Sequence, residues 1–513
     1  MARQAHSRLI AAGLWLLAGS VAAWMAWCHD SRIALDWERV LGPALLLSLH
    51  LLSLVSWELV FLIRRLRVLR PLPPLVALSA WCWAGMPPEV SAGSGARDGP
   101  DIVLVTLDTF RGDHVRPDLT PRLLGLADEG VRFTQAVTTA PLTAPAHASM
   151  LTGLPVDEHG LLANGRAVEV DTIVPALSEA GYRTGAFISA HVLDRHTELD
   201  RGFHHFDDRW GWGQRMNWWP VVDSLDLPRR GHVRGGDETV ERALSWLSPD
   251  TADFVWVHLY DAHAPYVVPP RWRPSDEAEE RARDLDQAVL DAKRGTLTSL
   301  VAFLQSAQPE TEKLRYRSAI RYTDHLLGTL LDGLDEDTIV LVVGDHGESL
   351  DEHGYYFNHG ARLWEPSLGV PLVVRWPGAL DSGEVRERLV GVSLVHDLVL
   401  AAAGLAEIPE LETREVLAYT TGQQAHAQAP SPDQVKGPRR GAALRFDGSK
   451  LLLHPDREPV WHDLRIDPQE LHPQPVPETM QPHLERLRAL VDEVPPPLSD
   501  EQRRRLEALG YVE

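Results

Sequence analysis

Five apolar segments recur between residues 100 and 380, and the first of them ends in polar residues. They read DIVLVTLDT, RTGAFISA, DFVWVHLY, TIVLVVGDHG and VPLVVRWPG. Short continuous runs of this kind are typical of strands that are buried on both faces of a sheet. Helix-like stretches such as VPALSEAGY and YRSAIRYTDHLLGTLLDGL separate them. This alternation of predicted strands and helices predicts an α/β fold in which helices cover a doubly wound sheet.

The end of the chain follows a different pattern. RFDGSKLLLHP and PVWHDLRIDPQE predict short antiparallel strands joined by turns, and SDEQRRRLEALGYVE predicts a closing helix. We therefore expect residues 440–513 to form a small α+β subdomain that completes a catalytic domain at residues 101–439.

Three apolar runs precede the α/β region, at residues 9–27, 41–63 and 72–86. About 20 apolar residues are needed to cross a bilayer core of roughly 30 Å. The first run is uncharged, and the second is long enough but contains His50 and Glu58. The third is short and bracketed by prolines, which leaves open a span, a re-entrant piece or an interfacial segment. Residues 1–90 are predicted to be a membrane anchor with two or three transmembrane helices.

Basic residues predict the orientation of this anchor. Four arginines follow the second run directly, namely Arg64, Arg65, Arg67 and Arg70. Such clusters remain in the cytoplasm. If the third run crosses, which we expect, the chain after Pro87 is extracytoplasmic; otherwise the catalytic part is cytoplasmic. Residues 91–100 form a polar, glycine-rich linker.

Composition narrows the choice of partners and metals. The 513-residue chain has a formal net charge of -22. This charge argues against a nucleic-acid partner, because nucleic-acid-binding proteins usually have a basic stripe or tail that neutralises the phosphate backbone. The two cysteines, Cys28 and Cys82, both lie in the apolar N-terminal part. The rest of the chain therefore has neither a disulfide framework nor a thiolate metal site.

Acidic and histidine side chains follow the predicted strands. Ligands collect at the carboxyl ends of strands in doubly wound sheets. Carboxylates and imidazoles without thiolates suit a catalytic divalent ion, with zinc, manganese, iron and calcium as candidates. The number of these residues is sufficient for one or two ions. They are Asp108, Asp261, His263, Asp345 and His346, with His359 shortly beyond.

The segment APLTAPAHASMLTG places Thr143 just ahead of a predicted helix. Free backbone N–H groups and the helix dipole favour an anion there, such as phosphate or sulfate. Thr143 could be a nucleophile, which coordination to a metal would activate, or it could simply cap the helix. Ser149 is a poorer candidate because it falls within the helix.

From about residue 100 to the C-terminus, the chain resembles the sulfatase family of the alkaline phosphatase superfamily. The segments that carry the resemblance, in the family's order, are DIVLVTLDTFRGDH, TAPAHASMLTG, HLYDAHAPY, GDHGESLDEHG, VPLVVRWPG and WHDLRIDPQE. The resemblance implies an alkaline phosphatase-like, doubly wound mixed sheet.

The family's nucleophile motif is Cys or Ser, any residue, Pro, any residue, Arg. Here Thr143 takes the first position and His147 takes that of Arg, so both are expected to be catalytic. Sulfatases oxidise the Cys or Ser to formylglycine, and a threonine cannot yield that aldehyde. We therefore expect no formylglycine. The family's usual second Asp is Thr109 here, and its substrate-binding Lys is His359.

The resemblance also implies which of the candidate ligands would bind each of two metal ions. One ion would be held by Asp108, Thr143, Asp345 and His346, and a second by Asp261, His263 and His359. Alternatively, His263 matches the histidine with which sulfatases hold the sulfate or protonate the leaving group. Arg111 and Asn164 are expected to bind substrate.

These features predict a membrane-anchored, metal-dependent hydrolase or transferase that cleaves phosphate or sulfate esters, with phosphate favoured. Expected substrates are small-molecule, lipid-headgroup or glycan esters. Two alternatives stay open, namely a sulfuric ester hydrolase that works without formylglycine, and an inactive sulfatase-like domain that only binds its ligand.

Overall fold

The computed structural model describes residues 99–209, 233–264, 266–274, 309–355, 357–422, 440–454 and 458–492. The chain divides into two units, residues 1–90 and 91–513, and all described residues belong to the second. The predicted transmembrane helices and the predicted closing helix lie outside the described residues. Within the described part, no helix has both the length and the apolar character needed to cross a bilayer.

An eight-stranded sheet forms the centre of the described part, in the order β4-β3-β5-β1-β6-β7-β2-β8. Strand β7 runs antiparallel to both of its neighbours, and the other pairings are parallel. The prediction of a mixed α/β sheet is therefore confirmed. The strands are β1 (Ile102–Leu107), β2 (Val131–Val137), β3 (Arg183–Ile188), β4 (His205–Asp207), β5 (Asp253–Leu259), β6 (Ile339–Gly344), β7 (Gly369–Arg375) and β8 (Glu384–Gly391).

The five strands predicted from continuous apolar runs are β1, β3, β5, β6 and β7. Three strands were missed. Strand β4 has only three residues, and β8 (EVRERLVG) is an edge strand whose first half is charged and partly exposed. In β2 (VRFTQAV) polar residues interrupt the apolar pattern. A search for fully buried strands cannot find segments of this kind.

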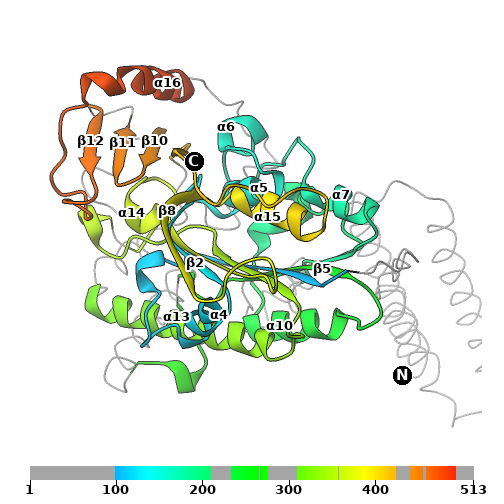
Figure 1. Ribbon diagram of the computed structural model, residues 1–513. Coiled ribbons are helices and arrows are strands. Elements are labelled where there is room, and N and C mark those ends of the chain that lie inside the picture. The colour runs from blue at the N-terminus through cyan, green and yellow to red at the C-terminus, as the bar shows by residue number, and fades with distance from the viewer. Residues whose placement is uncertain are drawn as a thin grey trace, which may run out of the picture. The chain divides into compact units, whose positions relative to one another are not determined.

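Helices cover both faces of this sheet (Figure 1). One face packs against α5 (Thr143–Thr152), α7 (Ile173–Glu179) and α15 (Leu394–Ala402). The other packs against α4 (Pro121–Asp128), α10 (Gly236–Trp246) and α13 (Pro309–Leu331). Alternate residues of β1 supply the two cores, because successive side chains of a strand point to opposite faces.

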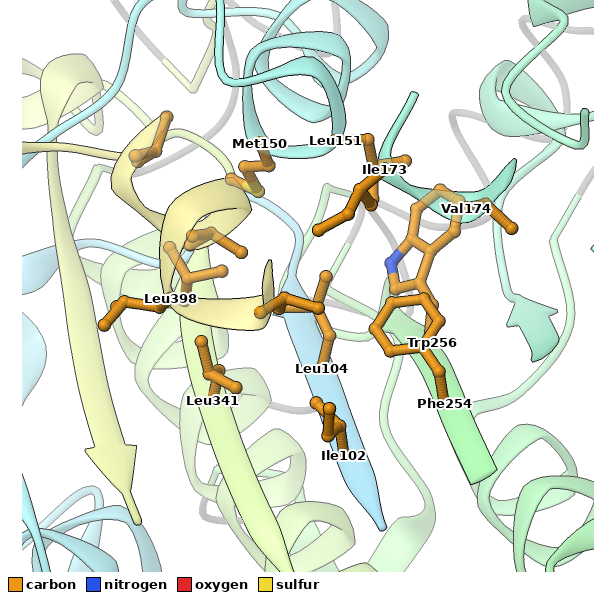
Figure 2. Packing of buried hydrophobic residues seen from close by; sticks show 14 of the residues in the cluster. Ile102, Leu104, Met150, Leu151, Ile173, Val174, Phe254, Trp256, Leu341 and Leu398 are labelled. Carbon is orange, nitrogen blue, oxygen red and sulfur yellow. The ribbon is translucent and has the colours of Figure 1, made fainter. Parts of the chain in front are cut away.

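Figure 2 shows the first of these cores. Ile102 and Leu104 of β1 lie between Leu341 of β6 and the aromatic rings of β5, and the helices close over them. Met150 and Leu151 come from α5 in this core. The helix that carries Thr143 is therefore held to the sheet by buried apolar contacts, which fixes the position of its first turn.

A second sheet, in the order β12-β11-β10-β9, is antiparallel throughout. Its strands are β9 (Glu415–Thr420), β10 (Gly441–Phe446), β11 (Ser449–Leu453) and β12 (Val460–Asp463), and α16 (Gln481–Asp492) packs against it. The antiparallel strands expected after residue 440 are present. The sheet begins earlier than expected, because β9 precedes that boundary.

Candidate active site

The candidate site lies where β1, β5 and β6 end. These three strands are parallel neighbours, with Leu107 of β1 aligned with Leu259 of β5 and Gly344 of β6. Two backbone hydrogen bonds extend the pairing beyond the strands, from Asp108 N–H to the Leu259 carbonyl (2.9 Å) and from Asp345 N–H to the Leu107 carbonyl (3.1 Å). The polar residues that follow β1 and β6 therefore lie side by side.

A strained turn fixes the direction of the chain after Asp108. Thr109 has a positive φ of 51°, which is rare for a β-branched residue. Its N–H donates to Asp345 Oδ1 (3.1 Å), and its carbonyl accepts from the Tyr316 hydroxyl of α13 (2.7 Å). Surrounding structure thus holds a backbone conformation that a threonine would otherwise avoid.

Asp108 and Asp345 form a pair of fully buried carboxylates. Asp345 Oδ1 accepts from the N–H of Thr109 and of His346 (2.6 Å). Asp108 Oδ1 and Asp345 Oδ2 have no hydrogen-bond partner. Burial raises the pKa of both groups, and the negative charge of Asp108 raises that of Asp345 further. Two buried carboxylates with unused oxygens call for a cation between them.

The Thr143 hydroxyl meets this pair from α5. Its Oγ1 lies 3.3 Å from His346 Nε2 and 3.5 Å from Asp108 Oδ2. His346 Nδ1 donates to the Gly347 carbonyl (2.9 Å), so Nε2 carries the lone pair that faces Thr143. Burial, and next the charge of His359, lower the pKa of His346 to about 3, which keeps this imidazole neutral.

Asp108, Asp345 and His346 fit a divalent cation. They offer ligand atoms that all lie within 4.8 Å of one another. His346 Nε2 is 3.9 Å from Asp108 Oδ1 and 3.6 Å from Asp345 Oδ2. Ligand atoms about 2.0–2.1 Å from a tetrahedral zinc ion are about 3.3–3.4 Å apart. The donor atoms are therefore spaced only slightly wider than a bound ion requires.

His147 reaches the same region, but both of its nitrogens are engaged. Nδ1 donates to the Thr143 carbonyl (2.8 Å), and Nε2 lies 2.9 Å from Thr106 Oγ1. The Trp256 indole N–H donates to the same Thr106 oxygen (2.9 Å), so the hydroxyl is free to donate to His147. Burial holds the pKa of His147 well below its usual value. In these contacts His147 ties the first turn of α5 to the sheet.

Two further histidines border the cluster. The His359 ring lies 4.4 Å from that of His346 and 5.0 Å from that of His263. His359 Nδ1 lies 3.1 Å from the carboxylate of Glu348, which also accepts from the Tyr266 hydroxyl (3.2 Å). Such a carboxylate fixes the orientation and the tautomer of an imidazole. His263 stacks on Tyr260, whose hydroxyl lies 2.7 Å from its Nδ1.

Asp261 does not join the cluster, although it was expected to bind metal. Its Oδ1 accepts from Gly236 N–H (3.2 Å) at the start of α10, and its Oδ2 lies where a β-carbon on Gly236 would stand. Burial raises the pKa of Asp261 to about 7. In the structure this side chain caps a helix on the opposite face of the sheet from α5.

The two residues expected to bind substrate also have structural contacts. The Arg111 guanidinium contacts Asp113 (2.6 Å), Glu352 (2.7 Å) and the Glu348 carbonyl (3.1 Å). Asn164 Oδ1 accepts from Ala144 N–H (2.9 Å) and so supports the first turn of α5. These contacts hold the site together.

Comparison with known proteins identifies the family. Residues 100–408 match the sulfatase family. The chain belongs to this family. It is 25% identical to an arylsulfatase of Clostridium perfringens, over 60% of this chain and 75% of the relative. It is 26% identical to a choline-sulfatase of Rhizobium meliloti, over 54% of this chain and 63% of that one. The protein is a sulfatase-like ester hydrolase.

The fold of this chain is similar to that of solved structures. The phosphonate monoester hydrolase of Agrobacterium radiobacter superimposes with a TM-score of 0.56 at 19% identity, over 80% of this chain and 99% of that one. The similarity confirms the expected sulfatase and alkaline phosphatase-like architecture.

Sequence reasoning missed two buried residues at the site of this sulfatase-family protein. Glu348 holds His359, and His258 of β5 lies 3.3 Å from Asp108. A signal for each was present. Glu348 stands two positions after His346 in GDHGE, and His258 is a polar residue inside the apolar run FVWVHL.

Proposed function

We propose that this protein cleaves phosphate or sulfate esters with Thr143 as nucleophile and with a divalent cation bound by Asp108, Asp345 and His346. The observation that carries the proposal is the position of the Thr143 hydroxyl, fully buried and within 3.5 Å of both Asp108 and His346. In the structure Thr143 is the first residue of α5 and the N-cap position belongs to Leu142, so Thr143 does not stand where a capping side chain would.

The chemistry follows from these contacts. A threonine hydroxyl is a weak nucleophile, and a divalent cation bound there would stabilise its alkoxide. His147 and Asn164 hold the carbonyl of Thr143 and the next N–H, so Oγ1 keeps its place. Thr143 Oγ1 gives up its proton to solvent water when the alkoxide forms. Attack on the ester then forms a Thr143 ester and breaks the bond to the leaving oxygen, which takes a proton from protonated His263. Water then hydrolyses the Thr143 ester: its proton returns to His263, its oxygen bonds to the phosphorus or sulfur atom, and Thr143 Oγ1 leaves as the alkoxide again.

Formylglycine has no part in this proposal, because threonine cannot be oxidised to an aldehyde. The named relatives include an arylsulfatase, and a structural neighbour is a phosphonate monoester hydrolase. Both sulfate and phosphorus esters therefore belong among the candidate substrates. With the nucleophile unmodified and imidazoles at the site, we favour a phosphoester.

We further propose that residues 1–90 anchor the protein in a membrane, with the catalytic domain outside the cytoplasm. The support is the sequence pattern of apolar runs followed by an arginine cluster. An anchored enzyme meets substrates at the membrane surface, such as lipid headgroups or envelope glycans that carry phosphate or sulfate esters.

The test is turnover by the purified full-length protein of four aryl esters: a phosphate monoester, a phosphodiester, a phosphonate monoester and a sulfate. We expect turnover of at least one class, loss of that turnover in Thr143→Ala and partial retention in Thr143→Ser. A covalent intermediate trapped on another residue, or near-normal turnover in Thr143→Ala, would refute the assignment.

A further inference from the structure

His258 is a buried imidazole that the proposed reaction does not use. It lies in the middle of the sheet, on β5, paired with Thr106 of β1 and Ile188 of β3. None of its surface is exposed, and neither ring nitrogen has a hydrogen-bond partner. A buried polar group without hydrogen bonds costs free energy, so its presence at a fully buried strand position needs a physical reason.

Distances place this imidazole at the carboxylate pair. His258 Nε2 lies 3.3 Å from Asp108 Oδ2, closer than the 3.9 Å between His346 Nε2 and Asp108 Oδ1. His258 also offers a nitrogen within 4.8 Å of an Asp345 oxygen. The two imidazoles thus approach the two oxygens of one carboxylate.

His147 cannot take this place. It belongs to the same group of potential ligands as His258 and Asp345. Its two nitrogens are, however, bonded to the Thr143 carbonyl and the Thr106 hydroxyl, and its ring meets that of His258 edge to face at 5.2 Å. Ligation by His147 would break the contacts that hold the first turn of α5. Ligation by His258 would break no hydrogen bond.

We propose that His258 is a further protein ligand of the divalent cation, beside Asp108, Asp345 and His346. This inference rests on the proposed function, since that function supplies the cation. Two imidazoles and two carboxylates make a mixed nitrogen and oxygen donor set. Imidazole suits zinc and other transition ions, whereas calcium and magnesium prefer oxygen ligands. The site therefore selects a zinc-like ion over calcium.

The test measures metal binding by the full-length protein without any assay of turnover. Metal-free protein is titrated with zinc and with calcium in competition with a chelating dye, for wild type, His258→Ala and a control, His462→Gln. His462 is a buried histidine of the second sheet, bonded to Asp467. We expect one tightly bound zinc ion in wild type and control. In His258→Ala, the affinity for zinc should fall by more than about tenfold. Even the loss of a residue that only hydrogen-bonds to a metal ligand lowers metal affinity by at least about that factor.

X-ray absorption at the zinc edge of the wild-type protein gives an independent result if His258→Ala fails to fold. We expect two imidazoles per zinc ion. One imidazole, an unchanged zinc affinity in folded His258→Ala, or tighter binding of calcium than of zinc would overturn the inference and leave the proposed function intact. A wild-type protein that binds neither ion would overturn both.

Discussion

Replacing Asp261 with Asn separates a structural carboxylate from a metal ligand. Asp261 is fully buried, and its Oδ1 accepts from Gly236 N–H, an interaction that an Asn amide oxygen keeps. Burial is the main cause of the raised pKa of about 7, against 3.8 for the free group. Ionising this carboxylate therefore costs the folded state free energy, which the isosteric and neutral Asn avoids.

The size of this cost follows from the pKa difference. The folded protein binds the Asp261 proton more tightly than the unfolded chain, so stability falls as pH rises from about 4 and levels off above about 7. At about 1.36 kcal/mol per pKa unit, the roughly three-unit shift amounts to about 4 kcal/mol at pH 8. Asp261→Asn should match the wild type near pH 4 and exceed its stability by up to that amount at pH 8.

The assay is denaturant unfolding of both proteins from pH 4 to pH 8 in the presence of a chelator, followed by zinc titration. Asp250→Asn, which removes an exposed carboxylate, is the matched control. A stability difference that does not change with pH would contradict the reasoning. A loss of zinc affinity in Asp261→Asn would show instead that Asp261 is a metal ligand.

Four other changes test the site and its location. Thr143→Ala should lower kcat/KM by about three orders of magnitude or more, because it removes the oxygen that attacks the ester; near-normal kcat/KM for any aryl ester would count against this. Asp345→Ala should lose bound metal with an unchanged far-ultraviolet spectrum, whereas retained metal would make Asp345 a purely structural residue. His147→Gln should lower kcat by up to about 100-fold with unchanged metal content, because it loosens the turn that carries the nucleophile; an unchanged kcat would exclude this role. A reporter that works only outside the cytoplasm should be active when it is fused after Gly99, and activity there of a reporter that works only in the cytoplasm would rule out three spans.

Much of the architecture could be predicted because the central strands are buried on both faces. Strands β1, β5 and β6 are almost purely apolar, so their ends were recognisable without any knowledge of their neighbours. These three strands are adjacent in the sheet, in the order β5-β1-β6. This order is set by the topology of the whole chain and cannot be predicted from the local sequence of each strand. Strand β2 was missed because polar residues interrupt its apolar pattern, and β8 was missed because its first half is charged and partly exposed. Whether such segments form strands depends on packing partners far away in the chain.

The candidate site was predictable where a side chain directly follows a strand. Asp108 and Asp345 come one residue after parallel neighbours, so the sheet itself brings them together. Asp261 stands one position further along its loop, after Tyr260, and there the loop conformation decides the face to which a side chain points. His258 was overlooked for the opposite reason, since it precedes the strand end and its side chain reaches the site from within the sheet.

The balance of charge at the site bears on the choice of ester. The family motif has Arg and Lys where this chain has His147 and His359. A guanidinium is always charged, but an imidazole carries a charge only when it is protonated, and burial keeps His147 neutral. The guanidinium of nearby Arg111 is already paired with Asp113 and Glu352. A divalent cation would only balance the charges of the two carboxylates, so the site residues named here, all within the part of the chain that the structure describes, leave little positive charge for the substrate. A monoanionic group, as in a phosphodiester, a phosphonate monoester or a sulfate, should therefore bind this site better than a dianionic phosphate monoester.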